Sequence, residues 1–331
     1  MRYNDFSFEE MRRYFFSLQR VAKETGEYIL KQKGRNIMDT HDYKGHESST
    51  IDNAARECLQ SSLERHLPEF EGVIRFELRP FVKTLLELEE HKELSLIIDE
   101  IDGTTNTKRC LASSFEYRPL AAVSIALSLT NSLKDLVSGV IYTLDQGELF
   151  SSLRISEKDF LSFRDYRLID PVSVVSTLGD SKVRVLVIGY SNSHRLEKGE
   201  LEQTLYLNGF KTYEGCRSSG MDIINILRNS ADAYIDLRHY WSTKDKKGKE
   251  TEAMLQVYDV AGVIPIADGC GLKVTDAEGK SWKNYSLNDT IPLVVSRPRI
   301  HKEILSIIRP LVEKWKKENG GSKDLNSKRE K

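Results

Sequence analysis

The sequence lacks several features that would assign it to a specialised class of protein. Its four cysteines, Cys58, Cys110, Cys216 and Cys270, are scattered, with no Cys-x-x-Cys pair and no spacing typical of a zinc site. No apolar run approaches the roughly 20 residues that a membrane-spanning helix needs, and the N-terminus has no signal-peptide pattern. We therefore expect a cytoplasmic protein with reduced thiols and no membrane partner.

The sequence also lacks an excess of charge of either sign. Its 49 Lys and Arg residues nearly balance 50 Asp and Glu residues, so no broad positive field points to a nucleic-acid partner. No internal repeat is evident at a fixed period. A chain of 331 residues that is 39% hydrophobic and 30% charged fits a globular protein with one large domain or two packed halves.

What is present is a dense polar motif at residues 98–106, Ile-Asp-Glu-Ile-Asp-Gly-Thr-Thr-Asn. The apolar run before it predicts a buried strand, and Gly103 predicts a turn into a helix. The carboxylates of Asp99 and Asp102 offer hard oxygen ligands suited to Mg²⁺ or Mn²⁺, and the amides of Gly103, Thr104 and Thr105 can hold a phosphate. A polar turn that only caps a helix is the alternative interpretation.

A second motif lies in the last third of the chain. Asp259 is flanked by Tyr258 and by Val-Ala-Gly, and a glycine-containing turn follows at residues 268–271. The two motifs resemble the signatures of the inositol monophosphatase and fructose-1,6-bisphosphatase superfamily, Asp-Pro-Ile/Leu-Asp-Gly-Thr-Thr-Asn and Trp-Asp-x-Ala-Gly. Glu100 replaces the proline and Tyr258 the tryptophan. The motifs occur in the right order, 160 positions apart, and the resemblance covers about residues 40–300.

The resemblance implies a layered α-β-α-β-α sandwich of the sugar phosphatase type, α+β with an α/β part. Hydrophobic periodicity agrees: it predicts helices from Phe8 and over Thr50–His66, then an antiparallel meander that includes a half-buried strand near Val123–Leu129, and alternating strands and helices after residue 183. We expect an N-terminal antiparallel-sheet half over residues 1–165, a C-terminal α/β half over 166–315 and a disordered charged tail over 316–331.

The resemblance also implies a metal site built from carboxylates. One Mg²⁺ would be held by Glu77, Asp99 and the carbonyl of Ile101, and a second by Asp99, Asp102 and Asp259. Asp52 would be an outer ligand to a third ion, although a carboxylate at a helix start is also an ordinary helix-dipole partner. Mn²⁺ is expected to substitute for Mg²⁺.

Glu77 is chosen because it ends a strand-like run and lies 22 positions before Asp99. The resembling family places a metal-binding glutamate about that far upstream, typically in Gly-Glu-Glu, which this sequence lacks. Glu71, which precedes the apolar run, is the rival candidate. In the implied mechanism Glu77 and Thr104 orient and deprotonate a water, Asp99 acts through the metals, and the amides of Gly103, Thr104 and Thr105 steady the phosphate. Hydrolysis is then direct, without a phosphoenzyme.

Substrate-binding residues are less well defined. By resemblance to archaeal members, Asp236 would bind a sugar hydroxyl with Arg238 nearby, whereas counting back from Asp259 favours Glu252. Arg217 precedes a helix in an Arg-Ser-x-Gly element familiar from the superfamily. The basic stretch from Trp241 to Thr251 is either a substrate-covering flap or a solvated loop.

The predicted function is Mg²⁺-dependent hydrolysis of a small polyol or sugar phosphate, inositol-1-phosphate or fructose-1,6-bisphosphate. An adenosine 3′,5′-bisphosphate phosphatase, which shares both signatures, is one alternative, and a catalytically silent member that binds a phosphorylated ligand is another. A homodimer is expected from the family resemblance alone.

Overall fold

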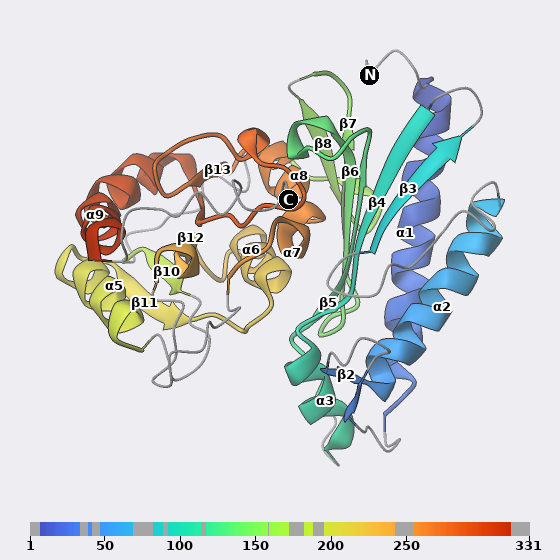
Figure 1. The fold of residues 1–331 in the computed structure, drawn as a ribbon, viewed down its shortest axis with the longest axis horizontal. Helices are drawn as coiled ribbons and strands as arrows, with labels where there is room; N and C mark the ends of the chain where they lie inside the picture. Colours follow the sequence, from blue (N-terminus) through green and yellow to red (C-terminus); the bar gives the residue numbers. More distant parts are fainter. Residues whose placement is uncertain are drawn as a thin grey trace, which may run out of the picture.

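The computed structural model describes residues 7–33, 39–41, 47–68, 82–88, 92–113, 117–157, 159–171, 182–187, 195–241 and 254–318. Two large sheets, of seven and five strands, are arranged side by side with helices against and between them (Figure 1). A small antiparallel ribbon is formed by β1 (Asp39–His41) and β2 (Glu47–Ser49). The predicted fold class, α+β with an α/β part, is confirmed.

The seven-stranded sheet follows chain order, and each strand pairs antiparallel with the next. Its strands are β3 (Val82–Leu88), β4 (Lys92–Asp102), β5 (Ala122–Ser128), β6 (Leu136–Thr143), β7 (Leu149–Arg154), β8 (Phe160–Arg164) and β9 (Arg167–Leu168). The predicted meander is therefore confirmed. The pairing of β4 with β5 shifts register between Asp99 and Asp102. Such an irregularity bends the strand end and redirects its side chains.

Two long helices, α1 (Phe8–Leu30) and α2 (Thr50–His66), cover one face of this sheet (Figure 1). A reciprocal capping box starts α1: Ser7 Oγ accepts from the Glu10 amide, and Glu10 accepts from the Ser7 amide. The apolar stripe of α1 is buried at Met11, Phe15, Leu18 and Ala22. Phe8 does not belong to it, because it begins the helix and is 53% exposed.

The strand predicted near Val123–Leu129 is found as β5, but the prediction that it is half-buried was wrong. Every residue of β5 is buried, the small polar side chains of Ser124 and Ser128 included. The reason is that α1 contacts the strand on one side, while the short helices α6 (Ser219–Leu227) and α7 (Val257–Ala261) contact it from the C-terminal half. A strand covered on both faces has no solvated side.

The five-stranded sheet has the order β11-β10-β12-β14-β13. Its strands are β10 (Arg184–Val187), β11 (Lys211–Glu214), β12 (Ala233–Asp236), β13 (Lys273–Asp276) and β14 (Leu293–Ser296). β10 pairs parallel with β11 and β12, whereas β14 runs antiparallel to β12 and β13. Helices α5 (Arg195–Leu207) and α9 (Pro298–Glu318) lie on the side away from the larger sheet (Figure 1). The expected α/β half is confirmed.

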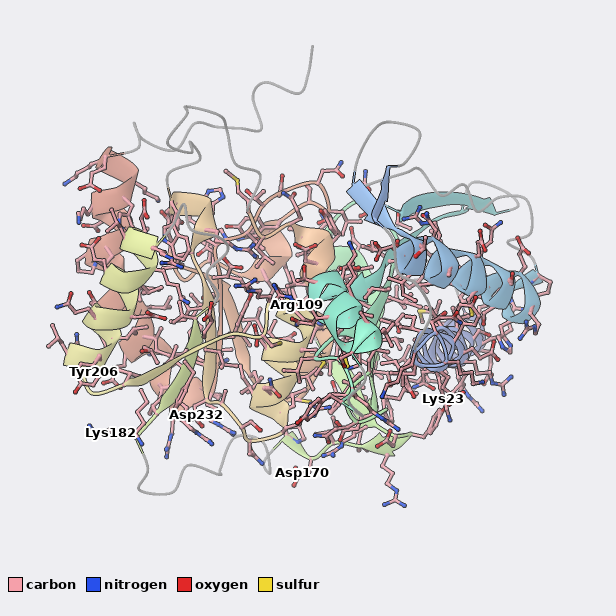
Figure 2. The ribbon with its side chains drawn as sticks, turned by 90° about the horizontal axis from the view of Figure 1, so that it is seen from below. Lys23, Arg109, Asp170, Lys182, Tyr206 and Asp232 are labelled. Carbon is pink, nitrogen blue, oxygen red and sulfur yellow. The ribbon has the colours of Figure 1, made fainter. Side chains whose placement is uncertain are left out.

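The space between the sheets is filled by α6, α7 and α8 (Ile264–Gly269). One cluster of buried side chains joins residues of both sheets, among them Ile141 of β6 and Tyr234 of β12. Figure 2 shows α3 (Thr104–Ala112), marked by Arg109, between the side of the molecule that carries Lys23 and the side that carries Tyr206. The motif at residues 98–106 is therefore placed at the junction of the two halves. The boundary near residue 165 stays a prediction.

The structure shifts the limits of two segments that were predicted from the sequence, the C-terminal tail and the loop that starts at Trp241. Helix α9 continues through Glu318, so it contains the first three residues of the expected 316–331 tail. Trp241 does not open a solvated loop: it is buried, and its ring meets the edge of Trp315 with centroids 6.3 Å apart. The remainder of both segments lies outside the described residues. No helix in the described part of the chain is long and apolar enough to cross a membrane.

Candidate metal and phosphate site

The site is built around the turn from β4 into α3. Gly103 has φ 100°, a left-handed conformation that residues with a Cβ rarely adopt. An added Cβ there would also lie 3.1 Å from Ala121 Cβ and from the Leu120 carbonyl oxygen. A glycine therefore allows the buried strand to turn at once into a helix. The predicted strand–turn–helix succession is found at the predicted residues.

Asp99 and Asp102 both stand at the end of β4. Asp99 is half-buried, and its Oδ1 accepts from the Ile101 amide at 3.1 Å. Burial, together with the negative charges of Asp102, Glu100 and Asp259, raises the pKa of Asp99 well above its usual range. Such a shift marks a place where negative charge is crowded and uncompensated.

Asp102 is buried and receives two donors from the other half of the molecule. Its Oδ2 accepts from Ser218 Oγ and from the Gly220 amide, each at 2.8 Å. Burial raises the pKa of Asp102 to about 6, although the hydrogen bonds from Ser218 and from the backbone of Gly220 oppose the shift. Both donors belong to the Arg-Ser-x-Gly element, whose contact with Asp102 was not predictable from the sequence.

Asp259 is the third carboxylate of the group. It lies in the first turn of α7, where its Oδ2 accepts from the Gln256 amide at 3.1 Å, so the residue also helps to cap its helix. Burial and the charge of Asp102 raise the pKa of Asp259 to about 7, and Arg238 opposes the shift. The structure thus brings Asp259 into electrostatic contact with Asp102 and Asp99 across 160 positions of sequence.

The chemistry of this donor set fits a divalent cation. Three mutually repelling carboxylates offer hard oxygens, and a bound cation would relieve their repulsion. In the described stretches no three His, Cys, Asp or Glu side chains converge closely enough to hold an ion on their own. Mg²⁺ in proteins commonly keeps several waters in addition to one or two carboxylate ligands.

The start of α3 offers polar groups of the kind that bind an anion. The first amides of a helix have no partner within the helix, and the dipole favours negative charge there. Gly103 and Thr104 are half-buried and Thr105 is exposed. Thr104 Oγ1 donates to the Ile101 carbonyl at 3.1 Å. The carbonyl predicted as a metal ligand and the hydroxyl predicted to orient water are therefore adjacent.

Glu100, at the position of the family's proline, forms an ion pair that sequence reasoning missed. Its Oε1 lies 2.7 Å from Nη2 of Arg56 on α2, and both side chains are mostly buried. Asp52, one helical turn before Arg56, is buried in the first turn of the same helix. Since residues four apart share a helix face, Asp52 is on the side of α2 that meets the end of β4. Its metal role stays a prediction.

The remaining predicted residues fall into two groups. Glu77, its rival Glu71, and Glu252 lie outside the described residues. Asp236 is fully buried on β12, where it accepts from Arg238 Nε and the Tyr234 hydroxyl. Arg217 is exposed and has φ 64°, immediately before the cap of α6.

Asn106, the last residue of the first motif, connects the two halves. Its Nδ2 donates to the Leu120 carbonyl at 2.8 Å and to the Cys216 carbonyl at 2.5 Å. Cys216 is 110 positions away in sequence. The motif indicates that Asn106 makes side-chain hydrogen bonds, since its amide nitrogen carries two hydrogens that need acceptors. The sequence did not indicate which acceptors these are.

Comparison with known proteins agrees with this arrangement. The model of the inositol monophosphatase family matches residues 10–313. A fructose-1,6-bisphosphatase/inositol-1-monophosphatase from Archaeoglobus fulgidus is 24% identical over an alignment of 229 residues that covers 66% of this chain and 70% of the relative.

Solved structures share the fold. Extragenic suppressor protein SuhB from Bartonella henselae superimposes with a TM-score of 0.62 at 18% identity, over 89% of this chain and 97% of that one. An IMPase/NADP phosphatase complexed with Mg²⁺ and phosphate gives a TM-score of 0.58 at 15% identity, over 88% and 91% of the two chains. Because the family model matches residues 10–313, nearly the whole length of this chain, the chain belongs to the inositol monophosphatase family and is a phosphoric monoester hydrolase.

Proposed function

We propose that this enzyme is a Mg²⁺-dependent phosphomonoesterase that hydrolyses a small polyol or sugar phosphate, inositol-1-phosphate or fructose-1,6-bisphosphate. The observation that carries the proposal is the grouping of Asp99, Asp102 and Asp259 near the turn from β4 into α3, where burial and the charges of neighbouring carboxylates raise the pKa of Asp99 and Asp259. Carboxylates for metal and free helix amides for phosphate are the two requirements of metal-assisted phosphate ester hydrolysis.

Two Mg²⁺ would be held by the three aspartates together with Glu77 and the Ile101 carbonyl, and Asp52 would reach a third. Bound ions of this kind lower the pKa of a coordinated water and neutralise charge on the phosphate oxygens. The Mg²⁺ and phosphate in the related IMPase/NADP phosphatase support this proposal. Mn²⁺ should substitute, because it accepts the same oxygen ligands.

The chain's own groups would orient and deprotonate the attacking water. The Thr104 hydroxyl donates its proton to the Ile101 carbonyl, which leaves its oxygen free to accept a hydrogen from that water. Glu77 would then remove a proton, and the amides of Gly103, Thr104 and Thr105 would steady the phosphate.

No covalent phosphoenzyme is required. Cys216, a thiol close to the carboxylate group, is a poor nucleophile because burial and the charge of Asp222 raise its pKa far above the usual range. Direct attack of water is therefore the mechanism we propose.

Of the two candidates for binding the sugar, we favour Glu252, because Asp236 is buried. Both carboxylate oxygens of Asp236 are already bonded to Arg238, and the residue has no exposed surface. A substrate hydroxyl would have to displace the guanidinium to reach it. Exposed Arg217 remains a candidate contact for a charged substituent. We further propose that the protein is cytoplasmic and forms a homodimer. Sedimentation of the purified protein would test the oligomeric state.

The deciding assay is phosphate release with Mg²⁺ from inositol-1-phosphate, fructose-1,6-bisphosphate and adenosine 3′,5′-bisphosphate, run with Asp99→Asn, Glu77→Gln and Glu71→Gln. We expect release from a polyol or sugar phosphate that is lost in Asp99→Asn and Glu77→Gln and kept in Glu71→Gln. Release from the nucleotide alone would replace the proposed substrate class. Full activity in Glu77→Gln with loss in Glu71→Gln would reassign the glutamate. No release from any substrate, with metal bound, would indicate a silent ligand-binding member.

A further inference from the structure

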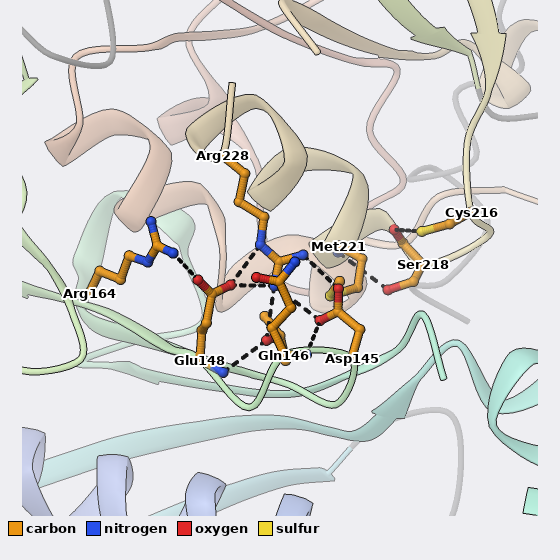
Figure 3. Close-up of polar contacts among 9 residues, drawn as sticks. Asp145, Gln146, Glu148, Arg164, Cys216, Ser218, Met221 and Arg228 are labelled. Carbon is orange, nitrogen blue, oxygen red and sulfur yellow. Dashed lines mark hydrogen bonds and ion pairs between the residues drawn. The ribbon is translucent and has the colours of Figure 1, made fainter. Parts of the chain in front are cut away.

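The segment from Cys216 to Arg228, which contains α6, is fixed to the first half of the molecule at both of its ends. Near its start, Ser218 and Gly220 donate to Asp102, and the Cys216 carbonyl accepts from Asn106. These contacts join a helix of the C-terminal half to the very end of β4. Figure 3 shows Ser218 and Met221 at this end and Arg228 at the other.

The far end of α6 is held by Arg228. This guanidinium donates to Glu148 at 2.7 Å, to both oxygens of Asp145 at 2.8 and 3.0 Å, and to Thr143 at 3.1 Å. Glu148 is also paired with Arg164 (Figure 3). All these acceptors belong to the hairpin between β6 and β7 or to the strand leading into it. Because both ends are anchored on one sheet, α6 has little freedom to rotate or slide relative to Asp102.

At the near end, the direction of the Ser218 hydroxyl proton is determined. Ser218 Oγ accepts from the Met221 amide at 3.3 Å as the cap of α6, so its single proton is directed to Asp102 Oδ2, 2.8 Å away. The Gly220 amide donates to the same oxygen, also at 2.8 Å. Two donors from one helix turn thus converge on one oxygen of one carboxylate.

Gly220 is required because there is no room for a Cβ beside Asp102, and not because of its backbone conformation. A Cβ added at this position would lie 2.8 Å from Asp102 Oδ2, with its next neighbour, Ile141 Cδ1, at an ordinary 3.5 Å. An alanine would therefore keep the amide donor but push the carboxylate away. Since alanine is the better helix former, its main cost should fall on the position of Asp102 and not on the stability of α6.

We propose that Ser218 and Gly220 are positioning residues for Asp102: they hold its Oδ2, so that Oδ1 is the oxygen offered to a bound divalent cation. The inference rests on the proposed role of Asp102 as a metal ligand and adds the groups that orient it. Outer contacts of this kind fix the geometry of a ligand, and their loss typically weakens metal affinity by about tenfold to 100-fold. A role of Ser218 in capping α6 alone would predict no such loss.

The test measures binding of Mn²⁺ alone, without substrate, from the electron paramagnetic resonance signal of the free ion. The variants are Gly220→Ala, Ser218→Ala and Asp102→Asn. Ser7→Ala is the matched control, because it removes the serine cap of α1 with no contact to the site. Melting temperatures measured in chelator show that each variant is folded.

We expect Gly220→Ala to melt at or above the wild-type temperature and yet to bind Mn²⁺ about tenfold or more weakly. Ser218→Ala should lose affinity and melting temperature together, and Ser7→Ala only melting temperature. Unchanged affinity in Gly220→Ala and Ser218→Ala, with loss in Asp102→Asn, would overturn the positioning role alone. Unchanged affinity in Asp102→Asn would overturn the role of Asp102 as ligand and this inference with it.

Discussion

Asp222 offers a direct measure of how far burial controls the carboxylates near the site. It has no exposed surface, its Oδ1 accepts from the Cys216 amide at 2.9 Å, and its Oδ2 has no hydrogen-bond partner in the described part of the chain. The nearby Cys216 thiol is directed instead to the Ser218 carbonyl. Burial, with smaller contributions from Asp102 and Asp236, raises the pKa of Asp222 to about 7.

The sign of the effect on stability follows from the two protonation states. The unfolded chain releases this proton near pH 3.8, whereas the folded protein keeps it up to about pH 7, so stability falls as pH rises through that window. At about 1.4 kcal/mol per pKa unit the loss amounts to at most about 4 kcal/mol. Asp222→Asn cannot ionise and should remove this part of the pH dependence.

The assay is urea unfolding of the metal-free protein at pH 4 and pH 8. We expect Asp222→Asn to be more stable relative to wild type at pH 8 than at pH 4: the difference in the free energy of unfolding, variant minus wild type, should be more positive at pH 8 by about 2–4 kcal/mol. Any constant cost of seating the amide cancels in that difference. Glu303→Gln, which removes a carboxylate from the exposed side of α9, is the control. An equal difference at both pH values would refute the argument that Asp222 is held protonated by burial.

Two further predictions concern ion pairs that anchor the site. Arg228→Met leaves Asp145 and Glu148 mostly buried without this partner, and should destabilise the protein by about 3–5 kcal/mol in chemical denaturation; a loss close to zero would show that α6 is not held there. In a double-mutant cycle on Arg56 and Glu100, Arg56→Met and Glu100→Gln should each lower stability, and the double variant should lose less than the sum; additive losses would mean that the 2.7 Å pair contributes no coupling.

The parts of the molecule that were predictable from the sequence are those set by short-range rules. The turn at Gly103 follows from an apolar run, a glycine and two hydroxyls in succession, and it is found where the sequence placed it. The limits of α2 were predicted to the residue, because the periodicity of its apolar positions is regular. The capping box of Ser7 and Glu10 at the start of α1 is a short-range signal of the same kind, since it lies within four residues.

What could not be predicted depends on contacts between distant segments. Ser218 donates to a carboxylate 116 positions earlier in the chain, and Arg56 pairs with a glutamate 44 positions later. Nothing local distinguishes these side chains from other capping serines and helical arginines. The burial of β5 on both faces was missed for the same reason, since alternation along a strand reports its own polarity and not the helices that cover it.

Contacts between segments that are distant in sequence also explain how the site tolerates its concentration of negative charge. Burial raises the pKa of Asp99, Asp102 and Asp259, and the charges of neighbouring carboxylates add to the shift at Asp99 and Asp259. In the metal-free protein the ionisation of these groups therefore opposes folding as pH rises. Fixed donors from a different half of the chain, Ser218 and Gly220, oppose the rise in the pKa of Asp102, and the positive charge of Arg238 opposes it as well. Donors of this kind orient a carboxylate without neutralising it. Carboxylates held in this way remain negative enough to attract a divalent ion. Because that ion binds the folded state, its binding stabilises the fold.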